Sequence, residues 1–403
     1  MHITRTVSLR HGSASILVFA LSLFLVSCKQ ENVATNPSSI NPNDQTPVNS
    51  SIPKSLAPLV DPADNPTTAA KVELGRHLFY DKEMSVDHST SCASCHDVSS
   101  GFSDSRSLAT SMGFDGQMGN RNAPSLANVA YNTSFTWDGR FGTLEKHAPG
   151  PIFNSVEMGN NFSQSAFDSI PSGYNSKPGN NDTNFLFKRL NGEPKALRKD
   201  INGKTYDDLR KAAWGPGADR FTLDMIAKSI AAFERTFIST RSDFDKYNNG
   251  DKEVLKYNAS AIHGFQLFTD TKGANCVSCH SGYNFTDQSY HDNGIGINQQ
   301  GDEGRFAITK LKSDVGKFKT PSLRNVALSA PYMHDGRYKT LEMVIRDNYL
   351  KGGKHNTANK DANIKPLTLS DEDIADLVAF LNTLTDYSFT ADKAGRYANP
   401  WGN

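Results

Sequence analysis

Two short cysteine and histidine motifs are the residues of this sequence whose types and spacing most directly imply chemistry. Cys92-Ala-Ser-Cys95-His96 lies in the first half of the chain, and Cys276-Val-Ser-Cys279-His280 lies in the second. Two cysteines three positions apart can each bond to a vinyl group of haem, and the histidine that follows is then held beneath the iron as its proximal ligand. The sequence therefore predicts two covalently attached c-type haems.

Three other uses of paired cysteines explain the sequence less completely. A zinc site built from two CxxC pairs gives no role to the histidine that follows each pair. A thioredoxin-like dithiol normally follows a strand in an α/β pattern, which is not legible in this sequence. Structural disulfides are allowed outside the cytosol, but they also leave the repeated histidines unexplained.

The segments that follow the two motifs resemble each other. Pro124 and Pro321 each begin a Pro-Ser-Leu-x-Asn-Val-Ala segment, and each is followed 14 residues later by an Asp-Gly-Arg sequence, at Asp138 and Asp335. Agreement over such a distance indicates an internal duplication. We therefore expect an all-α fold of two cytochrome c-like (class I) haem domains, because such domains wrap a few helices around the porphyrin.

The two copies differ where an axial ligand of the iron could lie. Trp137 in the first copy stands where His334 stands in the second. The second copy then offers Tyr349 or Met343 as a second axial ligand, whereas the first has Gly150-Pro151-Ile152 at the corresponding offset. The sequence predicts a haem 2 that is closed on both sides and suits electron transfer, and a haem 1 with an open side that can bind a substrate.

A carboxylate follows the expected open site. Glu157 comes a few residues after Ile152, and a carboxylate beside a haem could carry a proton between the two oxygens of a peroxide. The alternative is that Glu157 is a solvated surface residue.

Two apolar stripes predict helices that pack in the core. Ser370 and Asp373 mark a helix start, which is followed by apolar residues at helical spacing, Ile374, Leu377, Val378, Leu381 and Leu384. A second stripe is expected to close the first domain or to bridge the two domains, and it consists of Ile226, Ile230, Phe233 and Phe237.

The N-terminus has the pattern of an export signal. Arg5 and Arg10 precede a short apolar run that ends in Leu25-Val26-Ser27-Cys28. This ending resembles the lipobox of bacterial lipoproteins and makes Cys28 the expected lipid anchor, with an ordinary signal peptide as the alternative. The Asn-, Ser- and Pro-rich stretch that follows predicts a flexible tether. The balance of 43 basic and 43 acidic residues gives no sign of a nucleic-acid partner.

Taken together, these motifs resemble the bacterial dihaem cytochrome c peroxidases and the related MauG-type enzymes. The resemblance covers the chain from about Ala57 to Asp386. Beyond the two CxxCH motifs it includes Arg121-Asn122-Ala123-Pro124, Trp137-Asp138-Gly139-Arg140, Gly150-Pro151-Ile152, Glu157-Met158, Ala232-Phe233-Glu234-Arg235-Thr236 and Ala330-Pro331-Tyr332-Met333-His334-Asp335-Gly336.

The resemblance implies roles for individual residues. His96 and His280 would be the proximal iron ligands, Glu157 the distal acid–base residue, and Trp137 the aromatic residue between the haems on the electron path. Family members also hold a calcium ion between their domains. The matching oxygen donors are the Asn122 side chain and the backbone carbonyls of Ser329 and Pro331.

Three positions depart from the peroxidase pattern. Phe114 stands where some family members have a histidine that caps haem 1 at rest, so we expect activity without prior reduction. His147 replaces a distal glutamine and could help proton transfer or simply hydrogen-bond at the rim of the site. Tyr349 resembles the MauG arrangement at haem 2, with Met343 as the alternative ligand.

At 403 residues the chain suits about two or three domains, at roughly 100–200 residues each. We expect a lipoprotein signal peptide over residues 1–27 and a tether over 28–55. An N-terminal peroxidatic haem domain over 56–220 and a C-terminal electron-transfer haem domain over 221–403 would follow.

The resemblance implies reduction of hydrogen peroxide to water at haem 1, with electrons from a small cytochrome c or cupredoxin entering through haem 2. One rival is a MauG-like enzyme that oxidises a partner protein or another substrate. The other is a plain electron-transfer dihaem cytochrome. The protein is expected in the periplasm or cell envelope, held to a membrane by its lipid alone, and the resemblance also implies a homodimer.

Overall fold

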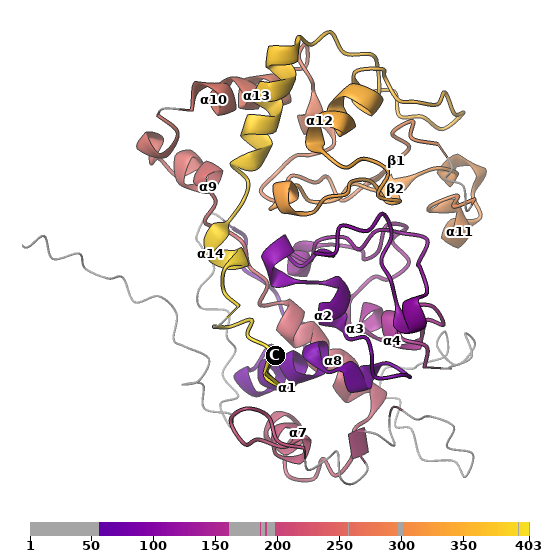
Figure 1. Ribbon diagram of the computed structural model, residues 1–403, viewed down its shortest axis with the longest axis vertical. Coiled ribbons are helices and arrows are strands. Elements are labelled where there is room, and N and C mark those ends of the chain that lie inside the picture. The colour runs from indigo at the N-terminus through magenta and orange to yellow at the C-terminus, as the bar shows by residue number, and fades with distance from the viewer. Residues whose placement is uncertain are drawn as a thin grey trace, which may run out of the picture. The chain divides into compact units, whose positions relative to one another are not determined.

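The part of the chain that the structure describes is built mainly of helices, with one short pair of strands (Figure 1). The computed structural model describes residues 56–160, 186, 190–191, 198–256, 258–296, 301–393 and 395–402, all within one unit, Asn36–Asn403. Cys28, the expected signal peptide and the expected tether lie outside the described residues. The elements are α1 (Ala69–Tyr80), α2 (Cys92–Cys95), α3 (Leu144–His147), α4 (Pro149–Phe153), α7 (Tyr206–Trp214), α8 (Leu223–Glu234), α9 (Asp243–Asn248), α10 (Ala259–Thr269), β1 (Tyr290–His291), α11 (Phe306–Thr309), β2 (Phe318–Lys319), α12 (Leu341–Val344), α13 (Asp371–Asn382) and α14 (Tyr387–Thr390).

Polar side chains fix where the longer helices begin. Thr68 at the start of α1 and Thr222 at the start of α8 each accept a hydrogen bond from the backbone N–H three residues further on. Ser370 and Asp373 form a reciprocal capping box at the start of α13. These bonds satisfy N–H groups that have no partner within the helix. The helix start predicted at Ser370 is confirmed.

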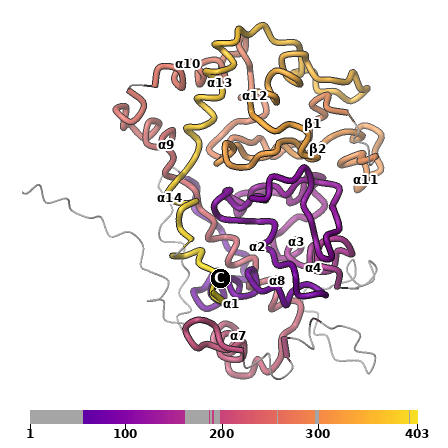
Figure 2. The backbone as a smooth tube through the Cα atoms, in the orientation of Figure 1, coloured from indigo at the N-terminus to yellow at the C-terminus, as the bar shows by residue number. Residues whose placement is uncertain are grey.

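Two helix pairs cross at a glycine. Helix α1 packs against α8, and α10 packs against α13 (Figure 2). A Cβ atom at Gly75 would lie 1.9 Å from the carbonyl oxygen of Ser229, and one at Gly264 would lie 1.9 Å from that of Asp376. Only glycine permits such a close approach of two backbones. The crossings fix α1, which leads to the first CxxCH motif, and α10, which leads to the second.

The first hydrophobic core surrounds α1 and α8. Phe79 is fully buried there, and Phe102 stacks on Phe237 with ring centroids 3.8 Å apart. The stripe predicted on the second apolar helix lies wholly in this core, namely Ile226, Ile230, Phe233 and Phe237. Of the two roles expected for the stripe, the packing supports closure of the first core.

The C-terminal segment returns to the first core. Phe389 and Tyr397 are buried in it, and the Tyr397 hydroxyl donates to the Thr236 carbonyl at 2.7 Å. Trp401 Nε1 donates to the carbonyl of His77 in α1 at 3.0 Å. Figure 1 shows the yellow C-terminal end of the chain beside α1. The domain boundary expected after residue 220 remains a proposal. Both α8 and the C-terminal segment come after residue 220 in the sequence, but they pack in the first core.

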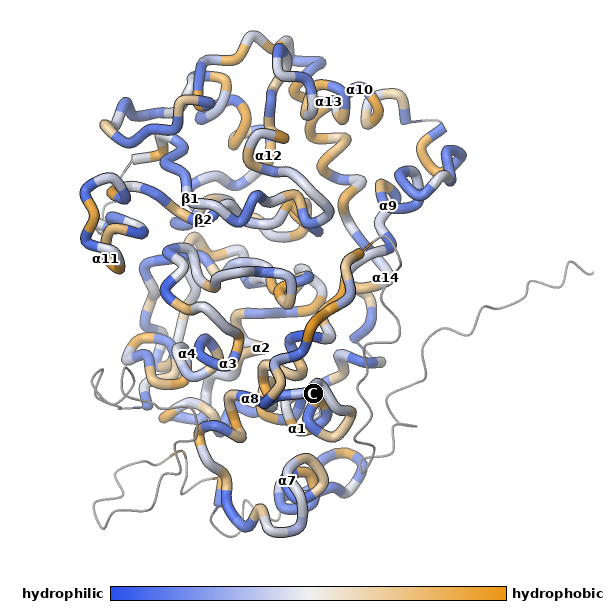
Figure 3. The backbone as a smooth tube through the Cα atoms, turned by 180° about the vertical axis from the view of Figure 1, so that it is seen from behind, coloured by the Kyte–Doolittle hydropathy of each residue, from blue (hydrophilic) through white to orange (hydrophobic). Residues whose placement is uncertain are grey.

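The second core lies around α10 and α13. The predicted apolar face of α13 is confirmed, because Ile374, Leu377 and Leu381 are buried, as is Leu384 just beyond the helix. Val378 is partly buried against the same cluster. Figure 3 shows hydrophobic and hydrophilic positions alternating along α13, as expected for a helix with one side in a core.

A small two-stranded sheet, which follows the second CxxCH motif in sequence, contacts the segment around Trp137. Strands β1 and β2 pair antiparallel, with Tyr290 opposite Lys319 and His291 opposite Phe318. The backbone N–H of Lys319 also donates to the Trp137 carbonyl at 2.8 Å. The sheet therefore holds the tryptophan segment in place. Within the described part of the chain, none of the helices has the length and apolar character needed to cross a membrane.

Candidate functional site

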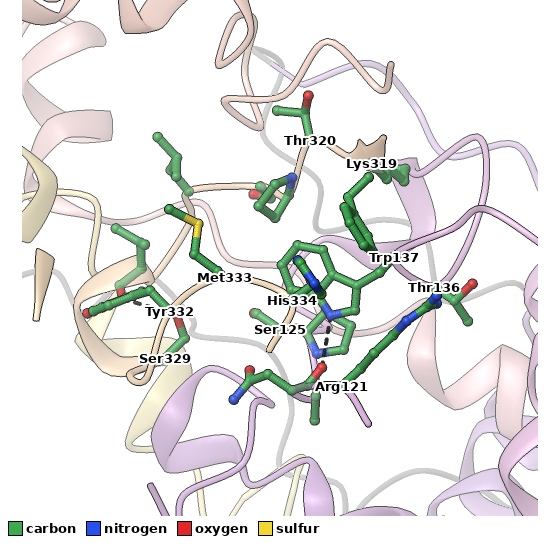
Figure 4. Close-up of a pocket in the computed structure, with 18 of the residues that line it drawn as sticks. Arg121, Ser125, Thr136, Trp137, Lys319, Thr320, Ser329, Tyr332, Met333 and His334 are labelled. Carbon is green, nitrogen blue, oxygen red and sulfur yellow. Dashed lines mark hydrogen bonds between the residues drawn. The ribbon is translucent and has the colours of Figure 1, made fainter. Parts of the chain in front are cut away.

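Both cysteine and histidine motifs open onto one large cavity. Its volume is about 1010 Å³, and its lining includes Cys95, His96, Cys276, Cys279 and His280. This size lies at the upper end of the roughly 300–1,000 Å³ that small-molecule pockets usually have. Figure 4 shows a part of the wall, where side chains before and after the midpoint of the chain face each other. The cavity is therefore large enough for a bulky cofactor.

The first motif presents its groups in the arrangement that haem attachment requires. Cys92 and Cys95 occupy the first and last positions of α2, and neither forms a disulfide. Burial raises the pKa of both thiols, that of Cys95 to about 11. His96 Nδ1 lies 2.8 Å from the carbonyl oxygen of Phe102. Because a carbonyl can only accept, Nδ1 carries the hydrogen and Nε2 keeps a lone pair for a metal.

The second motif repeats this arrangement. Neither Cys276 nor Cys279 forms a disulfide, and burial raises the pKa of the Cys276 thiol to about 12. His280 Nδ1 donates to the Phe285 carbonyl at 3.0 Å, which again leaves Nε2 free to bind a metal. Burial lowers the pKa of both His96 and His280, so both imidazoles are neutral and suited to ligation. The cavity and these two donor sets fit two covalently attached haem groups.

Glu157 lies near the first motif. It follows α4 in a turn that Asn154 organises, and the Asn154 amide donates to Glu157 Oε1 at 2.9 Å. The carboxylate lines the cavity, and its charge contributes to the raised pKa values of Cys92 and Cys95. The Glu157 side chain is accessible because it lines the open cavity. The protein atoms around its carboxyl nevertheless bury this group from solvent and raise its pKa. The carboxyl is thus placed to exchange a proton inside the cavity.

His147 lies in the same region. Its ring packs between Phe135 and Phe141, with centroid distances of 5.9 and 5.5 Å. Its Nδ1 is buried without a hydrogen-bond partner among the described residues. Burial lowers the pKa of His147 to about 4, with His96 and Arg140 adding to the effect. The imidazole is therefore neutral and can still offer or accept one hydrogen bond in the cavity.

Arg140 is a site residue to which the sequence reasoning gave no role. It lines the cavity, and its charge lowers the pKa values of both Glu157 and His147. Asp138 holds its guanidinium at 2.7 Å. The available signal was the Asp-Gly-Arg sequence itself, which places an arginine two residues after the aspartate that binds it.

Phe114 braces the turn that carries Glu157. Its backbone N–H donates to the Glu157 carbonyl at 2.9 Å, and its ring lies so close to Gly159 that a Cβ there would be 2.5 Å from Phe114 Cε1. Met112 and Gly113 of this segment line the cavity, and Phe114 is not among the lining residues. The segment thus supports Glu157 rather than presenting the Phe114 ring to the cavity.

Trp137 and His334 meet at the wall shared by the two parts of the chain. Their ring centroids are 6.4 Å apart, and Trp137 Nε1 donates to the Asn122 carbonyl at 2.8 Å (Figure 4). The residues that precede them, Thr136 and Met333, have positive φ angles of 69° and 74°. Such angles are unfavourable for residues other than glycine. Both turns keep this conformation and present an aromatic ring to the cavity.

Tyr349 lies near the second motif. It lines the cavity, and charges on Cys276 and Cys279 contribute to its raised pKa, which burial brings to about 12. The Asn293 amide lies 3.4 Å from its hydroxyl. Met343, the alternative ligand, is not among the residues that line the cavity. Of the two candidate ligands, Tyr349 is therefore the one that lines the cavity.

Asn293 and Met333 also line the cavity, and the sequence analysis gave neither residue a role in the site. The Asn293 amide also approaches Met333 Sδ, at 3.7 Å, so it bridges this sulfur and the Tyr349 hydroxyl. Asn293 follows β1 in a segment without a counterpart in the repeat, and no local pattern marked it.

The three residues expected to bind calcium all line the cavity, namely Asn122, Ser329 and Pro331. The Asn122 amide nitrogen lies 3.3 Å from the Ala109 carbonyl, and its backbone N–H donates to the His334 carbonyl at 2.7 Å. These bonds occupy the nitrogens of Asn122 and leave its side-chain oxygen as the atom that could bind a cation.

Two family descriptions match this chain. Residues 69–253 match "Di-haem cytochrome c peroxidase", and residues 261–385 match "Cytochrome c". Cytochrome c domains imply covalently bound haem c, in agreement with the donor sets of both motifs.

Similar proteins carry two kinds of name, MauG and cytochrome c peroxidase. The methylamine utilization protein MauG of Methylorubrum extorquens is 35% identical over 323 residues, which cover 80% of this chain and 80% of that protein. The cytochrome c551 peroxidase of Pseudomonas aeruginosa is 32% identical, with 79% of this chain and 80% of that protein covered. The crystal structure of a MauG-like protein associated with microbial copper homeostasis is 32% identical, with a TM-score of 0.73, and covers 88% of this chain and 99% of that chain. On these similarities, the chain belongs to the enzyme family of the di-haem cytochrome c peroxidases and MauG proteins.

Proposed function

We propose that this protein reduces hydrogen peroxide to water at its first haem, with electrons from an external donor that enter through the second. The observation that carries the proposal is the different surroundings of the two motifs. Glu157, a carboxyl with a raised pKa, lies near the cysteines of the first motif. Tyr349, a potential iron ligand, lies near the cysteines of the second. The first side suits proton transfer and the second suits electron transfer.

The cysteines and histidines of the two motifs would hold the haems. Haem c, when bound, supplies the iron at which the oxygen–oxygen bond is broken and through which electrons pass. The protein contributes a neutral imidazole on one side of each site, from His96 and His280, whose Nδ1–H groups are fixed by backbone carbonyls. These bonds orient both rings.

Glu157 moves the proton. Its carboxylate would accept a proton from one peroxide oxygen and return it to the other, which leaves as water. Two electrons and two protons convert one peroxide into two waters. Asn154 holds the carboxyl in position through its amide, and the raised pKa of Glu157 makes proton exchange easier near neutral pH.

Arg140 and His147 complete this side of the cavity. The Arg140 guanidinium is positive and stabilises negative charge on the departing oxygen. His147 is neutral, because burial lowers its pKa to about 4, and it can hydrogen-bond to the peroxide without carrying charge into the site.

Trp137 provides the electron path between the two sides. Its indole lies between the two parts of the chain, fixed by the hydrogen bond to Asn122 and adjacent to His334. Both Trp137 and His334 line the cavity that would hold the haems.

Tyr349 favours a second candidate function, MauG-like oxidation of a partner protein. A tyrosine ligand would stabilise ferric iron and help to hold oxidising equivalents. A peroxide-consumption assay with a reduced small cytochrome c or cupredoxin as sole electron donor separates the candidates. Sustained consumption supports the peroxidase, whereas consumption that stops after about one turnover per chain supports the MauG-like reaction.

Four further features belong to the proposal. The residues Asn122, Ser329 and Pro331 are proposed to bind calcium, supported by their common place on the cavity wall. The protein is proposed to be exported to the periplasm or cell envelope and held by a lipid on Cys28. We propose that the two haem domains arose by duplication, supported by the paired helix crossings at Gly75 and Gly264. A homodimer is proposed on the family resemblance alone.

A further inference from the structure

Lys319 is a buried cation in the wall of the cavity. It lies in β2, only 7% of its surface is exposed, and it is among the residues that line the cavity. Figure 4 places it beside Trp137, to whose carbonyl its backbone N–H donates. Burial lowers the pKa of Lys319 to about 8, although the charge of Asp287 opposes this effect. A buried ammonium group is costly unless an anion or hydrogen-bond acceptor compensates it.

The other basic side chains of the cavity wall do not share this situation. Arg121 forms ion pairs with Asp138 and Asp302, both at 2.6 Å. Arg140 forms an ion pair with Asp138, and Lys365 is exposed. Among the described residues, no carboxylate forms an ion pair with Lys319 within 4 Å, and Asp287 acts on it through its charge alone. Lys319 is therefore the buried cation of this wall that has no direct ion pair within the described part of the chain.

The Asp287 carboxylate, whose charge acts on Lys319, already accepts hydrogen bonds from other groups. Asp287 Oδ2 accepts a hydrogen bond from His291 Nε2 at 2.8 Å, and its Oδ1 accepts one from the Ser289 N–H at 2.9 Å. His291 is itself held on its other nitrogen by Asp361 at 2.6 Å. The Asp287 carboxylate thus hydrogen-bonds to His291 and Ser289, and its charge reaches Lys319 without a direct ion pair.

We propose that Lys319 binds a propionate carboxylate of one of the two haems and thereby raises the reduction potential of that haem. Each haem c carries two such carboxylates, and a haem attached through either CxxCH motif would occupy the cavity that Lys319 lines. A charged hydrogen bond between ammonium and carboxylate compensates both groups. The nearby ammonium favours the reduced iron, because reduction removes positive charge from the haem. The inference rests on haem attachment, as proposed above, and not on turnover of peroxide.

Reduction potentials of substituted holoproteins test this pairing. Lys319→Met removes the cation at similar length, Lys319→Arg keeps a cation, and Lys365→Met is the control because Lys365 lines the same cavity but is exposed. Each protein is first checked for two haems per chain by its pyridine haemochrome spectrum. Spectroelectrochemical titration then follows the two haems separately.

We expect Lys319→Met to shift the reduction equilibrium of one haem about tenfold towards the ferric state, equivalent to about 59 mV for one electron. The haem that shifts is the one whose propionate is bound. Lys319→Arg and Lys365→Met should titrate close to the unsubstituted protein. Unchanged potentials for both haems in Lys319→Met would overturn the proposal, and loss of haem is recognised separately from the haem count.

A second measurement applies if Lys319→Met does not assemble with both haems. The unsubstituted protein and Lys319→Arg are prepared with haem labelled with carbon-13 at the propionate carboxyls, and their redox-difference infrared spectra are compared. A shift of a labelled carboxylate band on exchange of ammonium for guanidinium supports the pairing. Identical labelled bands in the two proteins would contradict it.

Discussion

Asn154 holds Glu157 from two directions. Its amide nitrogen donates to Glu157 Oε1 at 2.9 Å, and its amide oxygen accepts the backbone N–H of Glu157 at 3.2 Å. One side chain therefore fixes both the turn and the carboxyl group that projects from it into the cavity. Two contacts between residues only three positions apart thus place the carboxyl group that is proposed to carry the proton.

The first prediction concerns Glu157 itself. Glu157→Gln keeps the shape of the side chain and the contact with Asn154 but removes the group that carries the proton. Loss of a positioned general acid–base group typically lowers the rate by roughly 10²–10⁴-fold, so we expect kcat to fall by that amount while both haems stay attached. Steady-state peroxide consumption and the haem count check this. Glu253→Gln is the control, because Glu253 is 76% exposed. Near-normal activity of Glu157→Gln would remove the residue from the proposed mechanism.

The second prediction concerns pH. Burial raises the pKa of Glu157, and the charge of Arg140 opposes this effect. The hydrogen bond from the Asn154 amide also favours the charged carboxylate, because it is donated to the carboxylate oxygen. Asn154→Ala should therefore raise the pKa of Glu157 further. Since the carboxylate is the form that accepts the proton, the acidic limb of the kcat profile should move to higher pH. A profile of lowered height and unchanged position would show that Asn154 supports only the fold of the turn.

The third prediction separates the two candidate ligands of the second haem. Tyr349→Met should raise the reduction potential of that haem, because a thioether favours reduced iron more than a phenolate does. Met343→Leu should leave its absorption spectrum unchanged, because Met343 does not line the cavity. Spectroelectrochemistry on both variants checks this. Loss of the low-spin spectrum in Met343→Leu would instead identify Met343 as the ligand.

The fourth prediction concerns the crossing of α1 and α8, which positions the first CxxCH motif. Gly75→Ala would place a Cβ 1.9 Å from the Ser229 carbonyl oxygen and force α1 and α8 apart. Overpacking of this kind costs about 1–3 kcal/mol, so the thermal unfolding temperature should fall by several degrees. Gly142→Ala is the control, because a Cβ there meets no atom within 4 Å. Equal unfolding temperatures for the two variants would contradict the close crossing.

The sequence predicted those parts of the fold and the site that depend on residues close together along the chain. The CxxCH spacing places two thiols and an imidazole together within one turn, and Ser370 with Asp373 caps α13 through groups three residues apart. Glu157 was also found from sequence, although its proximity to Arg140 and Asn154 was not. Local spacing and side-chain chemistry were sufficient for these features.

The remaining features depend on contacts between distant segments. Lys319 lies beside Trp137 through a backbone hydrogen bond, and Asn293 reaches Met333 and Tyr349 from a loop. The return of Trp401 to His77 is of the same kind. No periodicity or spacing encodes such pairings, because they follow from how whole elements pack.

The most direct test of the account is the resting-state EPR spectrum of the fully oxidised holoprotein. The account predicts one high-spin ferric signal from the first haem, whose far side is open beside Glu157. It also predicts one low-spin ferric signal from the second haem, which is lost in Tyr349→Phe. Two low-spin signals that persist unchanged on addition of peroxide would contradict it, since neither iron would then have a site for the substrate.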